Sequence, residues 1–382
     1  MNEQPKKSLF RRFWWLIIIL AVLLAGFVLI TNKNPRDDKS ENLGKTITED
    51  AQNVKKDNDI KFTHQIFDPE KVSHITPLGE LNGGYEEAQT INGVMVNIKK
   101  DAGGNADPIE VYAPADMTLE DYSYFPDGNS PAQWHLGFRI SEDMKMSFDH
   151  LSSVPDEIKA VTPQTASSAY VPPTKRLSFK AGELIATTSG TEQAHNWNIY
   201  LRDDRKVNTF VNQERYEKVK QGYSFLNAAC PFDYYGDFEK SLYLALMGYS
   251  KAGESKTCGT NSKDAKGSVS GLWHLSKEGV QAEYQGQYAT PFSIYLASSN
   301  EIIIYEIGKK RYILGDKNST YKDPTSVTDS HCYNLTEYGD SRSTQGYAYF
   351  KIVSDTEMKI NFNSSGSCPS SFPETNAKTY YR

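Results

Sequence analysis

The pattern of apolar and polar positions divides the chain into three parts. Residues Phe13 to Ile30 form an unbroken run of 18 apolar or small residues. At about 1.5 Å per helical residue, this run is long enough to cross a hydrocarbon core of roughly 30 Å. Residues 31–58 are polar and charged and cannot bury enough apolar surface to fold, so we expect a disordered stalk. From residue 59 onward, short stretches alternate apolar with polar residues, which is the pattern of β-strands.

The residues around the apolar run predict how it is inserted. Residues 1–12 contain four basic side chains and one acid, so the positive-inside rule places them in the cytoplasm and everything after Thr31 outside. The alternative, a cleaved signal peptide, has a shorter apolar run and ends at a small-residue cleavage site, whereas Thr31 to Asn34 are polar. We predict a single-pass signal anchor over residues 13–30, which holds extracytoplasmic domains at the bilayer of the cell membrane.

Many short strands at even spacing, with long loops between them, favour a mainly β fold. We expect a barrel or sandwich over residues 59–202. Its predicted strands lie within Ile91–Ile98, Ile109–Asp116, Trp134–Ile140, Met144–Phe148 and Leu177–Leu201.

The remainder of the chain predicts a charged connector and a second β-rich domain. Residues 203–227 carry many charges, and residues 228–382 contain one helix signal and two hairpin patterns. In Phe238–Met247 the apolar residues Phe238, Leu242 and Leu246 repeat every four positions. We expect this helix to pack against a second, barrel-like sheet.

All four cysteines lie within residues 228–382, on the predicted outer side of the membrane. An even number of cysteines in an oxidising compartment favours two disulfides, and three pairings are possible. Cys230–Cys258 with Cys332–Cys368 is the preferred pairing, since it closes loops of roughly 30–40 residues that stabilise by about 3–4 kcal/mol each.

Charge excludes one class of partner. The net charge is −6 although residues 1–12 are basic, so the predicted ectodomain is more acidic than the whole chain. Because no basic stripe with interleaved aromatic residues is present, we expect no nucleic-acid binding.

Three short segments resemble the catalytic domain of lysostaphin-type zinc endopeptidases, which cut peptidoglycan cross-bridges. They are IEVYAPAD at Ile109–Asp116, FDHLS at Phe148–Ser152 and, after a Lys-Ala-Gly-Glu-Leu-Ile turn, HNWNI at His195–Ile199. The resemblance implies a β domain, a peptidoglycan substrate and a catalytic zinc.

The family's zinc positions are occupied by residues that cannot bind zinc. In this resemblance Ile91, Met95 and Trp197 stand where the family has its three metal ligands, while His150 and His195 stand at its two non-ligand histidine positions. A catalytic zinc needs three N, O or S ligands and an open position. The other candidate ligands have no recognisable ligand spacing; they are His74, Glu86, Glu87, His135 and Asp149. We therefore expect neither metal nor cofactor.

Four residues are the candidates for a binding groove: Tyr112, His150, His195 and Trp197. The alternative for the histidines is that they form hydrogen bonds at strand ends. Trp197 is expected either in the core or lining the groove, in preference to serving as a platform for a sugar. The order of anchor, stalk and domains also resembles an uncharacterised family of bacterial membrane-anchored envelope proteins. The sequence thus predicts a catalytically inactive, peptidase-like protein that binds a cell-wall polymer or an envelope protein. An active zinc-dependent peptidoglycan endopeptidase and a purely structural spacer are the alternatives.

Overall fold

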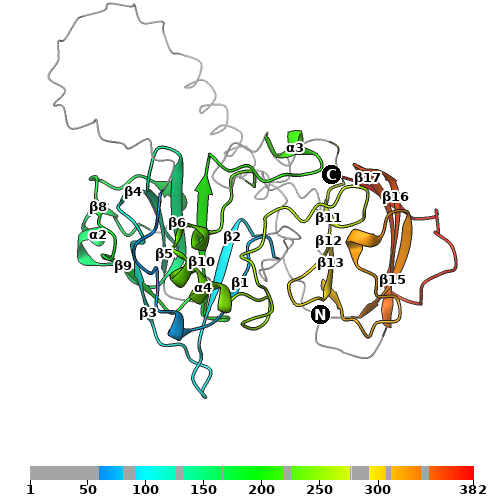
Figure 1. Cartoon of the computed structure of the whole chain (residues 1–382), viewed down its shortest axis with the longest axis horizontal. Helices are drawn as coiled ribbons and strands as arrows, with labels where there is room; N and C mark the ends of the chain where they lie inside the picture. Colours follow the sequence, from blue (N-terminus) through cyan, green and yellow to red (C-terminus); the bar gives the residue numbers. More distant parts are fainter. Residues whose placement is uncertain are drawn as a thin grey trace, which may run out of the picture. The chain divides into compact units, whose positions relative to one another are not determined.

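The computed structural model describes residues 60–80, 91–125, 132–165, 167–217, 225–275, 277, 292–306, 311–336 and 344–382 (Figure 1). The predicted anchor over 13–30 and stalk over 31–58 lie outside these residues and stay predictions. Within the described residues, no helix is both long and apolar enough to cross a membrane. They all belong to one compact unit, residues 54–382, which is mainly β and contains two large hydrophobic cores.

The first core is built on an eight-stranded sheet. The strand order is β1-β2-β10-β6-β5-β4-β7, with β8 paired to β4, and all of its pairings are antiparallel. Its strands are β1 (Val72–Thr76), β2 (Gly93–Ile98), β4 (Met117–Phe125), β5 (Gln133–Arg139), β6 (Met144–Leu151), β7 (Ser167–Val171), β8 (Ser178–Phe179) and β10 (Asn196–Asp203). Three further elements belong to this part of the chain: the paired strands β3 (Ile109–Tyr112) and β9 (Leu184–Thr188), and the helix α2 (Asp156–Val161).

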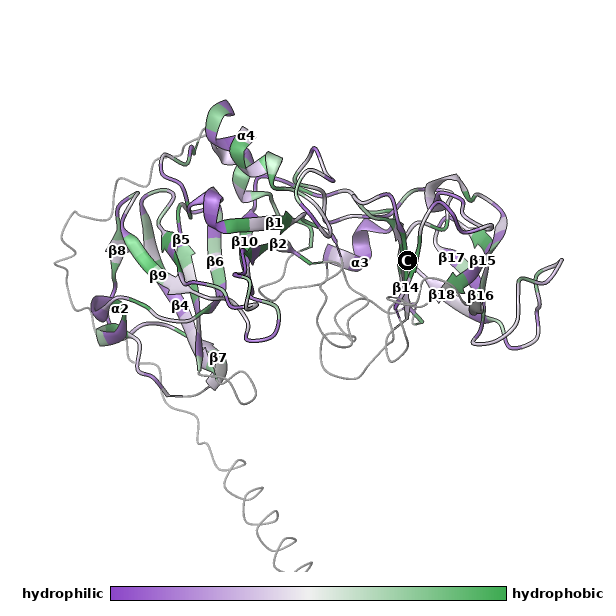
Figure 2. Ribbon diagram, turned by 90° about the horizontal axis from the view of Figure 1, so that it is seen from below, coloured by the Kyte–Doolittle hydropathy of each residue, from purple (hydrophilic) through white to green (hydrophobic). Residues whose placement is uncertain are grey.

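One face of this sheet forms the core, because side chains alternate between the two faces of a strand and paired residues share a face. Ile199 on β10 lies opposite Val94 on β2 and Phe148 on β6, and all three side chains are completely buried. Most of β9 is hydrophobic in Figure 2, whereas α2 contains both hydrophilic and hydrophobic residues.

The predicted helix packs on this first core and not on a second sheet. It is α4 (Asp237–Ala245), and it follows the short helix η2 (Pro231–Tyr234). Tyr243 and Met247 are fully buried in the first core, whereas Phe238 is 70% exposed. Phe238, one of the repeating apolar residues, therefore lies on the exposed side, because Phe67 and Ile75 approach the segment on the side of Tyr243 and Met247.

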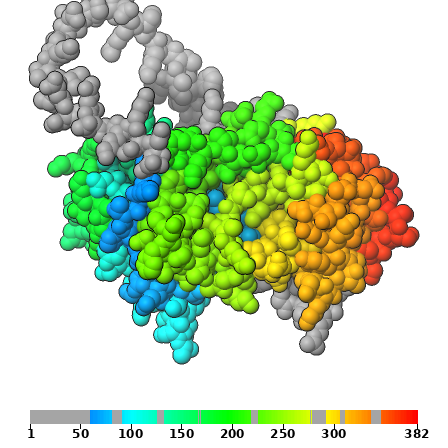
Figure 3. Space-filling view, in the orientation of Figure 1, coloured from blue at the N-terminus to red at the C-terminus, as the bar shows by residue number. Residues whose placement is uncertain are grey.

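Residues far apart in the sequence meet in this core. The backbone N–H of Phe62 donates to the carbonyl oxygen of Tyr234 at 2.9 Å, and the rings of Phe67 and Phe232 also meet edge to face. Figure 3 shows the blue segment near residue 70 beside the yellow-green residues near 240. Residues 228–259 therefore belong to the first core, which places the predicted domain boundary at 228 too early.

The second core lies between two four-stranded antiparallel sheets. One has the order β11-β12-β13-β14 and the other β15-β16-β17-β18. Phe292 of the first sheet contacts Phe350 and Tyr380 of the second, at 5.6 and 5.7 Å between ring centroids. The strands are β11 (Gly271–Trp273), β12 (Phe292–Leu296), β13 (Ile302–Glu306), β14 (Arg311–Leu314), β15 (Ser330–Thr336), β16 (Thr344–Ser354), β17 (Glu357–Asn363) and β18 (Lys378–Tyr381). Three short helices complete the described elements: η1 (Pro69–Lys71), α3 (Gln213–Glu217) and η3 (Pro324–Ser326).

The strand orders correct the barrel prediction. In the described residues each sheet has two different end strands, so none of them closes into a barrel. The second core is a sandwich of two sheets, one of the alternatives expected for the first domain.

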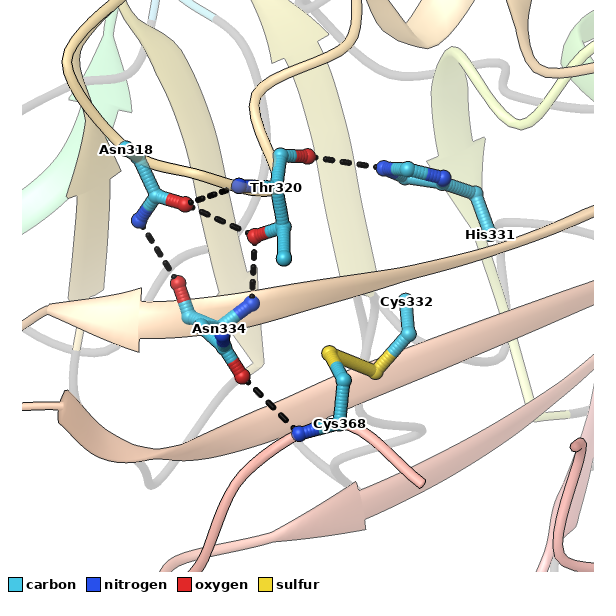
Figure 4. Close-up of a disulfide and its surroundings, with 6 residues drawn as sticks. All are labelled: Asn318, Thr320, His331, Cys332, Asn334 and Cys368. Carbon is cyan, nitrogen blue, oxygen red and sulfur yellow. Dashed lines mark hydrogen bonds between the residues drawn. A yellow bond between two sulfur atoms is a disulfide. The ribbon is translucent and has the colours of Figure 1, made fainter. Parts of the chain in front are cut away.

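Both preferred disulfides are present, Cys230–Cys258 and Cys332–Cys368. The first joins two segments of the first core. The second attaches residues 364–377, which we call the strap, to strand β15 (Figure 4). The backbone N–H of Cys368 also donates to Asn334 Oδ1 at 2.9 Å, so the disulfide is supported by a neighbouring hydrogen bond.

The strap is held along its length by polar contacts as well. Asn361 Nδ2 donates to the carbonyl oxygens of Pro373 and Thr375. Glu374 pairs with Lys351 at 2.7 Å and Lys359 at 2.9 Å, and these two ammonium groups lower the pKa of Glu374 to about 2. The Cys332–Cys368 bond is therefore the covalent part of a larger attachment between strap and sheet.

Candidate functional site

The two histidines singled out by the sequence share an unusual backbone conformation. His150 has φ of 60° and His195 has φ of 54°, in the left-handed region that residues other than glycine rarely adopt. At His150 the Asp149 carboxylate accepts the backbone N–H at 2.8 Å, beside an irregular stretch in the pairing of β5 with β6. At His195 the backbone N–H donates to the carbonyl oxygen of Thr191 at 2.9 Å, immediately before β10.

One turn, Thr188 to Gly190, holds both histidines. Thr188 Oγ1 donates to the carbonyl oxygen of His150 at 2.6 Å and accepts the N–H of Gly190 at 2.8 Å. Gly190 has φ of 71°, and a Cβ atom there would lie 2.4 Å from the backbone nitrogen of Asn196. Only glycine fits this position without displacing the start of β10.

Hydrogen bonds from the same turn fix the tautomers of the two imidazoles. The carbonyl oxygens of Ser189 and Gly190 can only accept, so His195 Nδ1 carries the proton that reaches Ser189 at 3.2 Å. Likewise Gln133 must turn Nε2 toward Gly190, at 3.3 Å. Its Oε1 then faces His150 Nδ1 at 2.7 Å, so this nitrogen carries the proton as well. Each neutral histidine therefore presents Nε2 as a hydrogen-bond acceptor.

A third histidine lies next to this pair, between two carboxylates. His135 on β5 is 6% exposed, and its Nδ1 has no hydrogen-bond partner among the described residues. His135 Nδ1 lies 3.9 Å from Asp149 Oδ1, and His135 Nε2 lies 4.0 Å from Asp121 Oδ1. We call Asp121, His135 and Asp149 the acidic cluster.

Burial sets the protonation of the acidic cluster. Removal from water lowers the pKa of His135, and this effect outweighs the opposite influence of Asp149 and Asp121. Burial also raises the pKa of Asp121, against the attraction of His135 and Lys145. His135 is accordingly neutral near pH 7, so the imidazole does not supply a positive charge to the two neighbouring carboxylates.

The three presumed zinc positions do not converge on one point. Trp197 lies opposite Val96 on the core face, whereas Met95 lies opposite Asn198 and so points to the other face. Trp197 is completely buried, with its ring edge-on to Phe67 and stacked on Phe148. The prediction that Trp197 lines a groove is therefore wrong, and the alternative that it is a core residue is confirmed.

Two of the remaining positions are also separate from the histidines. Ile91 is buried just before β2, where its N–H donates to the carbonyl oxygen of Glu80 at 2.8 Å. Tyr112 lies opposite Leu184 on β9. Leu184 is four residues from Thr188, the residue that holds His150, and four residues of strand span roughly 13 Å at about 3.3 Å per residue. Its hydroxyl donates to Glu110 at 2.6 Å. Tyr112 is therefore not grouped with His150 and His195.

The other candidate metal ligands do not form a cluster either. Within the part of the chain that the structure describes, no group of three or more His, Cys, Asp or Glu side chains is arranged to hold a metal ion. His74 lies on β1 and contacts Ser73 Oγ at 3.2 Å. Glu86 and Glu87 lie outside the described residues.

Sequence reasoning missed two members of this site, Gln133 and Asp121. Gln133 joins His150 to Gly190, and Asp121 faces His135 from β4. The one signal for Asp121 is the glycine opposite it on β5, Gly137. A Cβ atom at Gly137 would lie 2.4 Å from Asp121 Oδ1, so the carboxylate fits only beside a glycine. Neither residue belongs to a recognisable motif, so their roles depend on strand register.

Comparison with known proteins gives only distant likenesses. No protein-family model matches the chain. No curated protein matches it. Among solved structures it is similar to a chain of the SpoIIQ–SpoIIIAH pore-forming complex, at 12% identity and a TM-score of 0.24 over 42% of this chain and 99% of that one.

Two lysostaphin structures are also similar to this chain. The solution structure of lysostaphin gives 12% identity and a TM-score of 0.20, over 82% of this chain and 92% of that one. The antimicrobial peptidase lysostaphin from Staphylococcus simulans gives 15% identity and a TM-score of 0.21, over 78% and 85%. TM-scores this low assign neither a fold nor an activity to this chain.

Proposed function

We propose that this chain is a non-catalytic, membrane-anchored protein of the cell envelope, whose eight-stranded sheet binds a cell-wall polymer or a protein partner. The observation that carries the proposal is the position of Trp197. Its indole is completely buried on the core face, in contact with Phe67. Met95 points to the opposite face, so these two positions cannot share a metal ion. The resemblance in the sequence then concerns the sheet and the two histidines, without the zinc centre.

The histidine pair supports binding as the retained role. A neutral imidazole that lacks a metal cannot lower the pKa of a water molecule from about 15.7 to near 7. It can still accept a hydrogen bond at Nε2, and the turn at Ser189 and Gly190 orients both His195 and, through Gln133, His150. A left-handed backbone at both histidines costs of order 1–3 kcal/mol each, and such strain concentrates at functional sites.

The membrane part of the proposal is supported by the sequence alone. The 18-residue apolar run behind a basic N-terminus favours an anchor with its N-terminus in the cytoplasm. The two disulfides agree with an oxidising compartment for the folded part.

The alternative is an active zinc-dependent peptidoglycan endopeptidase, and one observation favours it. The hydrogen bonds at Nδ1 of His150 and His195 select the tautomer whose neutral form has its lone pair on Nε2, and general-base catalysis requires such a lone pair. A structural spacer is the third candidate, and it requires no binding at all.

A binding experiment separates the binder from the spacer. Purified wall fragments are passed over the immobilised full-length chain and over the variants His150→Asn and His195→Asn. Asparagine tolerates the left-handed backbone, so these variants remove the imidazole while keeping the turn. We expect the wild type to retain fragments and each variant to weaken retention about tenfold, as one lost hydrogen bond of roughly 1.4 kcal/mol predicts.

The control is His64→Asn, which removes an exposed histidine outside the site. It should bind like the wild type. Equal retention by all four proteins would contradict a role for the histidine pair. Release of soluble fragments over time would favour the endopeptidase, and failure of the wild type to retain fragments would contradict binding of a wall polymer.

A further inference from the structure

The acidic cluster lacks a cation. Neither Asp121 nor Asp149 forms a salt bridge with a lysine or an arginine among the described residues. Lys145, whose charge acts on Asp121, is paired with Glu120, as is Arg139. Asp121 and Asp149 remain reachable, because their side chains are 39% and 18% exposed.

The imidazole between them is an independent sign of a missing ligand. His135 is more than nine-tenths buried, and its Nδ1 faces Asp149 at 3.9 Å, too far for a hydrogen bond. Leaving such a buried polar atom unpaired costs about 1–3 kcal/mol. The charged groups that face the two ring nitrogens are the carboxylates of Asp149 and Asp121.

We propose that the acidic cluster binds a cationic peptide group, an ammonium or a guanidinium, of the ligand. Such a group supplies the positive charge that neither Asp121 nor Asp149 finds in a lysine or arginine partner among the described residues, together with several N–H donors for their carboxylate oxygens. Tyr170 on β7 adds an aromatic ring 4.6 Å from the ring of His135, beside which a cation is stabilised. An anionic polymer is disfavoured by the same two carboxylates. The inference rests on the proposed binding role and names the chemistry of what is bound.

The cluster also predicts how binding depends on pH. His135 faces Asp121 on β4, Asp149 and His150 on β6, and Tyr170 on β7. Its pKa is lowered, so it takes up a proton only below its ordinary value of about 6.5. The resulting imidazolium would neutralise the carboxylates and repel a cationic ligand. Affinity should therefore persist from pH 7 to about 6.5 and fall on further acidification.

The test uses four small probes of similar size on the full-length chain in a non-ionic detergent with chelator present. Ligand-observed NMR titrations with n-butylammonium and n-butylguanidinium should saturate, and those with n-butanol and butyrate should not. Whichever cation binds more tightly identifies the form of the group. Asp149→Asn should weaken binding about tenfold or more, as expected for one lost charge-assisted contact.

The matched control is Asp329→Asn, which removes the same charge from an exposed position just before β15. It should bind the probes like the wild type. Equal losses in both variants would show diffuse attraction to an acidic protein and overturn the site. Saturation by butanol, or binding of neither cation, would overturn it too. Wall retention is measured separately, so failure here leaves the proposed binding role standing with a different ligand chemistry.

Discussion

Replacing Trp197 by alanine is expected to destabilise the first core by about 3–5 kcal/mol, the usual range for truncating a large buried aromatic residue. The indole is completely buried and contacts Phe67 and Phe148. The alanine would leave a cavity between β10 and Phe67, which lies just before η1 (Pro69–Lys71). Chemical denaturation, monitored by far-UV circular dichroism because the variant lacks this tryptophan's fluorescence, measures the change in the free energy of unfolding.

Trp197→Phe is the matched control. The indole Nε1 has no hydrogen-bond partner among the described residues. Replacement by phenylalanine therefore removes buried apolar surface without breaking a hydrogen bond. We expect this variant to cost below about 1.5 kcal/mol, as hydrophobic replacements of similar shape usually do. If Trp197→Ala were as stable as the wild type, the indole would lie at a surface, and the account of the core face would be wrong.

Removing the Cys332–Cys368 disulfide is the second large effect. The double variant Cys332→Ser/Cys368→Ser opens a covalent loop with a sequence separation of 36, which the chain-entropy model values at about 3–4 kcal/mol. The loss should appear in unfolding of the second core under non-reducing conditions. Hydrogen exchange should rise first in residues 364–377, where Glu374 and Asn361 would be the remaining attachments.

The comparison variant here is Glu374→Gln. Its side chain is 55% exposed, and ion pairs at exposed positions contribute little in water, so the unfolding midpoint should stay close to that of the wild type. A serine double variant that unfolds like Glu374→Gln would mean that the strap is held by its other contacts and not by the disulfide.

Alternation along single strands was enough to predict much of the fold. The pattern within Ile91–Ile98 predicted β2. One of the two hairpin patterns predicted within residues 228–382 is the hairpin of β12 and β13, which turns at Ser298 to Asn300. Asn300 has φ of 62°, the left-handed conformation that asparagine tolerates in turns. The mainly β class and both disulfides were predicted correctly as well.

Prediction failed where distant segments decide which face is buried. The helical period predicted the helix but assigned it to a second sheet, whereas contacts with Phe67 and Ile75 bury Tyr243 and Met247 in the first core. These contacts pair segments more than 150 residues apart, so no local pattern contains them.

The candidate site shows the same division. His150 and His195 were found from short motifs that resemble those of a known family, and the structure adds that both have a left-handed backbone. Trp197 was assigned to a groove because a motif gives residue order without the face of the sheet. Strand register supplies that face, and it also brings Asp121 and Gln133 to the histidines.

Metal analysis of the full-length chain, purified without chelator and assayed for wall digestion, tests the absence of catalysis most directly. The account predicts no stoichiometric zinc and no cleavage, because Met95 and Trp197 lie on opposite faces of the sheet. About one tightly bound zinc per chain, together with chelator-sensitive cleavage that disappears in His150→Asn, would contradict it and establish the endopeptidase.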